Sequence, residues 1–104
     1  MTSVLVVDDS RLVRSLVGST LTEHGYEVGT ASDGHEAVEL VGMCDPDVVT
    51  MDVRMPEMDG IEAVERIMET SPTPVVMLSA HTAKGAEATI RALARGAVDF
   101  LHKP

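Results

Sequence analysis

Short apolar runs and helical patterns alternate along the whole chain. Five runs rich in β-branched residues predict strands at residues 3–7, 26–30, 47–51, 74–78 and 98–101. Between them, apolar residues recur three and four positions apart, which is typical of amphipathic helices. Strands that alternate with helices at this interval favour βα units, and continuous apolar strands favour a parallel sheet covered on both faces. The pattern therefore predicts a single α/β domain.

Four helices are expected between these strands. Their predicted apolar faces are Val13, Leu16, Val17 and Leu21 in the first; Ala37, Leu40 and Val41 in the second; Ile61, Val64, Ile67 and Met68 in the third; and Ala86, Ile90, Leu93 and Ala97 in the fourth. The first helix should end near Gly25. Ser32 or Asp33 can cap the start of the second helix, and Gly42 is expected to end it. Gly96 is expected to end the fourth.

Composition narrows the class of partner. The chain of 104 residues carries 17 acidic against 8 basic side chains, for a formal charge of −9. No basic patch is available for nucleic acid or anionic lipid, and no apolar run approaches the ~20 residues of a membrane span. A single cysteine, Cys44, cannot form an internal disulfide, which fits the reducing cytoplasm. Few lysines and an acid excess suit a halophilic protein, although an ordinary acidic domain fits them too.

Polar side chains follow four of the five expected strands. Asp8 and Asp9 follow the first strand, Asp52 the third, Ser79 the fourth and Lys103 the fifth. Ligands of open parallel sheets bind beyond the carboxyl ends of the strands. Each of these residues alone is an ordinary turn or cap residue, but together they predict a site with three carboxylates, one hydroxyl and one ammonium group.

Three carboxylates in one place repel one another. Two unit charges ~4 Å apart cost roughly 4 kcal/mol at an effective dielectric constant of 20. Either some of the carboxyl groups are protonated, or a cation lies among them. An all-oxygen site suits a hard divalent ion, and Mg²⁺ is favoured because it bridges carboxylates to phosphoryl oxygens. The four histidines are scattered along the chain, which argues against zinc.

A metal site beside a further carboxylate and a lysine indicates phosphoryl transfer. Asp52 stands alone on a central strand and is the best nucleophile, able to form an acyl phosphate. Asp8 and Asp9 are adjacent and can hold the metal together. Lys103 would neutralise one phosphoryl oxygen, and the Ser79 hydroxyl would donate to another.

Four motifs resemble those of response-regulator receiver domains: VVDDSR, MDVRMPEMDGIEA around Asp52, LSA, and the terminal KP. The resemblance covers nearly the whole chain and implies a flavodoxin-like (βα)5 three-layer sandwich. The sheet order 2-1-3-4-5 is known for this family and is not worked out from the residues. The resemblance also implies that the phosphohistidine of a sensor histidine kinase phosphorylates Asp52. Mg²⁺ would be bound by Asp8, Asp9, Asp52 and the backbone carbonyl of Arg54.

The resemblance assigns further roles near the expected phosphoryl group. Ser79 and Lys103 would contact it, and Phe100 takes the position of the aromatic residue that turns inward when Ser79 is drawn to the phosphate. An ordinary strand aromatic is the alternative for Phe100. Arg54 and His81 could tune the rate of dephosphorylation by shaping the access of water. We expect one receiver domain at 1–104 that ends after strand five, without the family's final helix, and that is either a piece of a longer protein or an incompletely ordered domain.

A narrower resemblance is to the receivers of chemotaxis methylesterases of the CheB type. It is carried by VVTMDVRMPEMDGIEAV and TAKGAEATIRALARGAVDFLHKP. It implies a CheA-like kinase as partner and an esterase domain as the regulated output. The chain has no G-x-S-x-G elbow, so we expect no esterase residues in it.

Other functions remain open from the sequence. The chain could be a stand-alone receiver or the receiver of a transcription factor, or a structural domain that binds partners without phosphorylation. It could also be a phosphatase acting through a phospho-aspartate. Such enzymes favour an acid two residues after the nucleophile, where this chain has Arg54.

Overall fold

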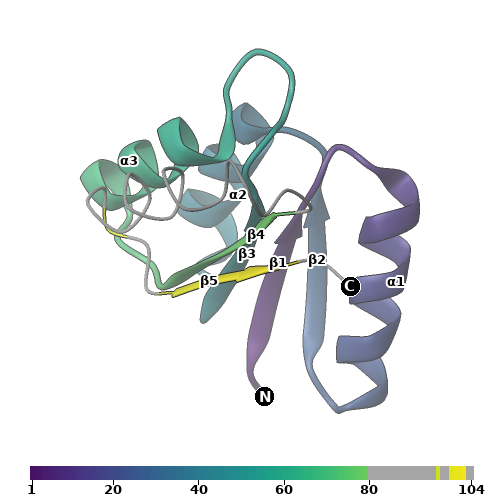
Figure 1. Cartoon of the computed structure of the whole chain (residues 1–104). Helices are drawn as coiled ribbons and strands as arrows, with labels where there is room; N and C mark the ends of the chain where they lie inside the picture. The colour runs from purple at the N-terminus through teal and green to yellow at the C-terminus, as the bar shows by residue number, and fades with distance from the viewer. Residues whose placement is uncertain (80–95, 97–98, 103–104) are drawn as a thin grey trace.

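A five-stranded parallel sheet forms the centre of the computed structural model, which describes residues 1–79, 96 and 99–102 (Figure 1). The strands are β1 (Ser3–Val7), β2 (Glu27–Ala31), β3 (Val48–Asp52), β4 (Val75–Ser79) and β5 (Asp99–His102). Their order across the sheet is β2-β1-β3-β4-β5, and every neighbouring pair is parallel. The predicted α/β fold and its sheet order are therefore confirmed.

Helices cover both faces of the sheet. The described helices are α1 (Arg11–Glu23), α2 (Gly34–Cys44) and α3 (Gly60–Thr70), and the fourth predicted helix lies outside the described residues. Figure 1 shows α2 and α3 on one side of the sheet and α1 on the other. None of these helices is long and apolar enough to cross a membrane.

The main hydrophobic core lies between the sheet and the α2/α3 layer. Alternate strand residues point into it, because successive side chains of a strand face opposite ways. The core residues contributed by the strands are Leu5, Val7, Ala31, Val49, Met51, Val75 and Met77. From α3 come Ile61, Val64 and Ile67, with Met68 partly buried beside them, as the helical spacing predicts.

The apolar face predicted for the first helix is wrong at Leu16, whose side chain is 60% exposed. The buried residue of α1 is instead Gly18. A Cβ atom added to Gly18 would lie 3.5 Å from Cγ1 of Val28, so the helix lies against β2 at this glycine. Gly18, and not Leu16, therefore lies against β2.

The predicted end of the second helix at Gly42 is also wrong, because α2 continues to Cys44. The left-handed position that a glycine often fills belongs here to Asp45, with φ of 46°, whose N–H donates to the carbonyl of Val41. At the other end, Asp33 is the N-cap, and its side chain accepts a hydrogen bond from the N–H of Glu36.

Strands β2 to β5 each begin one residue later than the apolar pattern predicts. Tyr26 shows why for β2. Its N–H donates to the carbonyl of Leu21, so the residue closes the turn after α1 and does not join the sheet. The shift matters at the other end, because Asp52 and Ser79 become the last residues of β3 and β4.

Candidate functional site

Three acidic side chains come together at the carboxyl edge of the sheet. Val7 pairs with Met51 across β1 and β3, so the next positions, Asp8 and Asp52, are neighbours on adjacent strands. Asp9 follows at the start of the β1–α1 turn. One carboxylate oxygen from each of the three residues lies within 4.8 Å of the other two.

The three carboxylates differ in exposure. Asp8 is 2% exposed and Asp52 is 6% exposed, whereas Asp9 is exposed to solvent. Two buried charges with a third, exposed charge beside them repel one another more strongly than charges in open water. The donor set is entirely oxygen and carries a high negative charge, which suits a hard divalent cation such as Mg²⁺.

The β1–α1 turn that carries Asp9 is closely tied by hydrogen bonds. The N–H of Ser10 donates to Oδ1 of Asp8 at 2.9 Å, and the N–H of Val13 donates to Oγ of Ser10 at 3.3 Å. Arg14 Nη1 donates to the backbone carbonyl of Asp8 at 2.7 Å. Ser10 is thus the N-cap of α1, a role typical of serine before a helix.

Sequence reasoning did not find Ser10 or Arg14. A serine just before a helical pattern is a readable capping signal, so Ser10 could have been found. Arg14 reaches back six residues to a backbone atom, and no spacing rule predicts such a contact.

The β3–α3 loop packs directly against the backbone of Asp52. The N–H of Val53 donates to the carbonyl of Leu78 at 3.2 Å, and the N–H of Gly60 donates to the carbonyl of Val53 at 2.9 Å. A Cβ atom on Gly60 would overlap the carbonyl oxygen of Asp52. Only glycine therefore lets α3 begin this close to the end of β3.

Three other predicted site residues lie among the residues that the structure describes. Ser79 ends β4 one position beyond the Asp52–Leu78 pair, so its backbone lies at the same edge of the sheet. Phe100 lies in β5 and pairs with Met77. Arg54 is exposed in the loop after β3. His81 and Lys103 lie outside the described residues.

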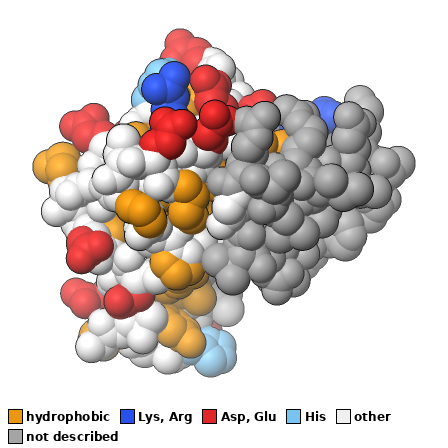
Figure 2. Space-filling model, turned by 90° about the vertical axis from the view of Figure 1, so that its left-hand side faces the viewer, with side chains coloured by type: hydrophobic (Ala, Val, Ile, Leu, Met, Phe, Trp, Pro, Cys, Tyr) orange, Lys and Arg blue, Asp and Glu red, His pale blue; other side chains and the backbone are white. Residues whose placement is uncertain are grey.

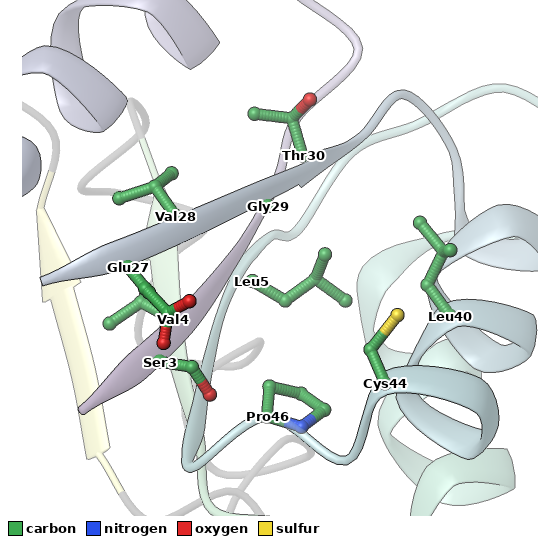
Figure 3. A pocket seen from close by; sticks show the side chains of 10 residues that line it. All are labelled: Ser3, Val4, Leu5, Glu27, Val28, Gly29, Thr30, Leu40, Cys44 and Pro46. Atoms are coloured by element: carbon green, nitrogen blue, oxygen red, sulfur yellow. The ribbon is translucent and has the colours of Figure 1, made fainter. Parts of the chain in front are cut away.

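A pocket of about 480 Å³ lies at the opposite edge of the sheet, between β2 and the end of α2 (Figure 3). Figure 3 shows Leu5 pointing toward Leu40, Cys44 and Pro46. Among the described residues that line it, Glu27 is the one that carries a charge. The described part of this lining offers no cation for a phosphoryl group, and the pocket lies at the other end of the strands from Asp8 and Asp52.

Comparison with known proteins identifies the family. A family model described as the response regulator receiver domain matches residues 4–104. This chain belongs to that family. The receiver is 54% identical over 105 residues to protein-glutamate methylesterase/protein-glutamine glutaminase 3 of Rhodospirillum rubrum, with 100% of this chain and 28% of that relative covered. The chain thus spans less than a third of this relative's length.

Solved structures agree with this assignment. The response regulator domain of Thermotoga maritima CheB superposes on the receiver with a TM-score of 0.92 and 47% identity, covering 100% of this chain and 79% of that one. A chain of the CheX-CheY-BeF3-Mg²⁺ complex from Borrelia burgdorferi gives a TM-score of 0.90 at 36% identity, and the match covers 99% of this chain and 78% of that one. The predicted resemblance to receivers of the CheB type is confirmed.

Proposed function

We propose that this receiver accepts a phosphoryl group on Asp52 from the phosphohistidine of a CheA-like sensor kinase. The observation that carries the proposal is the approach of Asp8, Asp9 and Asp52 to within 4.8 Å of one another through their carboxylate oxygens. Such a cluster can hold a divalent cation and present one carboxylate to an incoming phosphorus atom.

The proposed reaction is a transfer between two nucleophiles. An oxygen of the Asp52 carboxylate forms a bond to phosphorus, and the phosphorus–nitrogen bond of the phosphohistidine breaks. The electron pair leaves on the imidazole nitrogen, and the ring takes up one proton from solvent. The product is an acyl phosphate on Asp52 and an unmodified histidine on the kinase. Mg²⁺ supplies positive charge that offsets the negative charge of the carboxylates and the phosphoryl oxygens.

The remaining roles follow from where this chain carries the matching residues. Asp8 and Asp9 would hold the cation together with Asp52, and the backbone carbonyl of Arg54 would complete the protein ligands. Ser79 and Lys103 would contact the phosphoryl oxygens. The burial of Asp8 and Asp52 supports this assignment, because a dry site strengthens the attraction between a cation and its carboxylates.

We propose that the phosphoryl group shifts the balance between two conformations of the receiver. Ser79 drawn toward the phosphate would let Phe100 turn inward, which would change the surface offered to a partner. The similarity to methylesterases supports an esterase domain as the regulated output in the cytoplasm. Arg54 and His81 would tune the lifetime of the acyl phosphate through the access of water.

Incubation with acetyl phosphate, followed by mass spectrometry of the intact protein, tests the proposal. With Mg²⁺ we expect the gain of one phosphoryl group that persists for minutes and is absent with EDTA. Continuous release of phosphate without accumulation would instead indicate a phosphatase. No mass change with Mg²⁺ would contradict phosphorylation of this receiver and favour a domain that binds partners without it.

A further inference from the structure

The guanidinium group of Arg14 binds a backbone oxygen at the point where the sheet ends. The N–H of Asp8 donates to the carbonyl of Ala31 at 3.1 Å, which is the last step of the ladder between β1 and β2. The β1–β2 ladder does not continue beyond this hydrogen bond, because β2 ends at Ala31. Arg14 Nη1 instead donates to the Asp8 carbonyl at 2.7 Å. The side chain thus extends the hydrogen bonding of β1 beyond the sheet.

Arg14 also holds the far side of the same turn. Its backbone N–H donates to the carbonyl of Ser10 at 3.0 Å, which is the first helical hydrogen bond of α1. The guanidinium and the backbone N–H of Arg14 therefore bind the carbonyls at the two ends of the segment from Asp8 to Ser10. The side chain of Arg14 is partly buried, so its hydrogen bond is shielded from competing water.

We propose that Arg14 is a positioning residue for the cation site. Its guanidinium fixes the turn so that the carboxylates of Asp8 and Asp9 stand near Asp52 before a cation binds. Without this contact, mutual repulsion would push the exposed Asp9 outward, and binding would have to reorder the turn. This inference rests on the proposed function, since it assumes that the three carboxylates bind Mg²⁺.

The charge and the geometry of Arg14 act on Mg²⁺ affinity in opposite directions. A positive charge near the site repels the cation, so loss of the charge alone would tighten binding. A held turn favours the cation, so loss of the contact would weaken binding. The direction in which the dissociation constant moves therefore separates a positioning residue from a nearby charge.

Titration calorimetry with Mg²⁺ on the whole chain can measure this direction. We expect Arg14→Gln to raise the dissociation constant about tenfold, as for residues that orient metal ligands, and Arg14→Lys to raise it less. Arg11→Gln is the matched control, because Arg11 is exposed in the same turn of α1 and loses the same charge. Its dissociation constant should fall slightly or stay unchanged.

A second readout avoids the metal altogether. In EDTA, amide hydrogen exchange at residues 9–13 should be faster in Arg14→Gln than in wild type, while exchange in β1 and β3 stays the same. If Arg14→Gln does not fold, Arg14→Lys is compared with Arg11→Lys in the same two measurements.

Two results would overturn the inference. One is a dissociation constant for Arg14→Gln that is unchanged or lower than that of wild type, and the other is unchanged exchange in the turn. Absence of Mg²⁺ binding by the wild-type chain is a different result: it contradicts the proposed function and removes the site that Arg14 would serve.

Discussion

Asp9 is the exposed member of the carboxylate cluster, and this makes it the most informative residue to change. Asp9→Asn removes one of three charges and leaves the buried pair intact. In EDTA we expect the free energy of unfolding to rise by about 0.5–1 kcal/mol, since repulsion at an exposed position is partly screened. In excess Mg²⁺ the variant should be less stable than wild type, because one ligand is lost.

Thermal unfolding in EDTA and in Mg²⁺ measures both effects. Glu69→Gln, an exposed change on α3, is the control and should behave alike in the two conditions. A stability change of the same sign with and without Mg²⁺ would show that the three carboxylates do not share an ion.

At the scale of residues, the acidic cluster and the Ser10 cap could be predicted, and the contact from Arg14 could not. Asp8 directly follows one apolar strand, and Asp52 ends another. Because the carboxyl ends of parallel strands lie at the same edge of a sheet, the two residues could be expected to lie close together there. Arg14 lies on α1, and its reach to the Asp8 carbonyl depends on the path of the turn between strand and helix. Periodicity carries no information about that path.

The loop between β3 and α3 contains a residue in an unfavourable backbone conformation. Glu57 has φ of 65°, a region that glycine enters at little cost and that costs other residues about 1 kcal/mol. Glu57→Gly should therefore raise the free energy of unfolding by about 0.5–1 kcal/mol, measured in urea. Glu57→Ala keeps the strain and serves as the control. Equal stabilisation by both variants would point to the lost charge as the cause.

Two glycines in helices should respond to alanine in opposite ways. Gly60→Ala forces a Cβ atom onto the Asp52 carbonyl and should lower the free energy of unfolding by about 3 kcal/mol. Gly42→Ala lies on the exposed side of α2, where the new atom would be 3.7 Å from Oγ of Ser71. It should raise stability by about 0.5–1 kcal/mol, since alanine favours helix. A tolerated Gly60→Ala would contradict the close approach of α3 to β3.

At the scale of elements, whether a segment forms a strand or a helix was easier to predict than where that segment begins and ends. The strands and the three described helices follow the apolar periodicity. The predictions were wrong where one type of residue can take either of two structural positions. Gly42 could end a helix or lie within one, and Leu16 could face the core or solvent. In both cases the deciding contact comes from elsewhere: Asp45 caps α2, and Val28 meets Gly18.

The net charge of −9 belongs to the whole molecule. Figure 2 shows acidic side chains at the top and down the left-hand side of one face, with hydrophobic side chains nearer its centre. Repulsion among such charges opposes the compact state, and salt screens it. We expect the urea midpoint to rise as KCl increases from about 0.02 M to about 0.5 M.

A charge-reduced variant provides the comparison for the salt effect. Glu23→Gln, Glu39→Gln and Glu69→Gln together change three exposed residues and bring the charge from −9 to −6. The rise in midpoint with salt should be smaller for this variant. An identical rise in the two proteins would mean that salt acts on hydrophobic burial and not on charge.

At the scale of the molecule, alternation of strands and helices was enough to predict a parallel sheet between helical layers. The order of the strands was not available from periodicity, because a helical crossover can bring a strand to either side of its predecessor. It came from the family resemblance, and the pairing of β1 with both β2 and β3 agrees with it.

Titration calorimetry of the wild-type chain and of Asp52→Asn with Mg²⁺ tests the central claim most directly. Asp8, Asp9 and Asp52 approach one another closely enough to share a single ion. The wild-type chain should bind one Mg²⁺, and Asp52→Asn should bind it at least about tenfold more weakly. No uptake of Mg²⁺ by the wild-type chain, or equal affinity in the variant, would contradict the account.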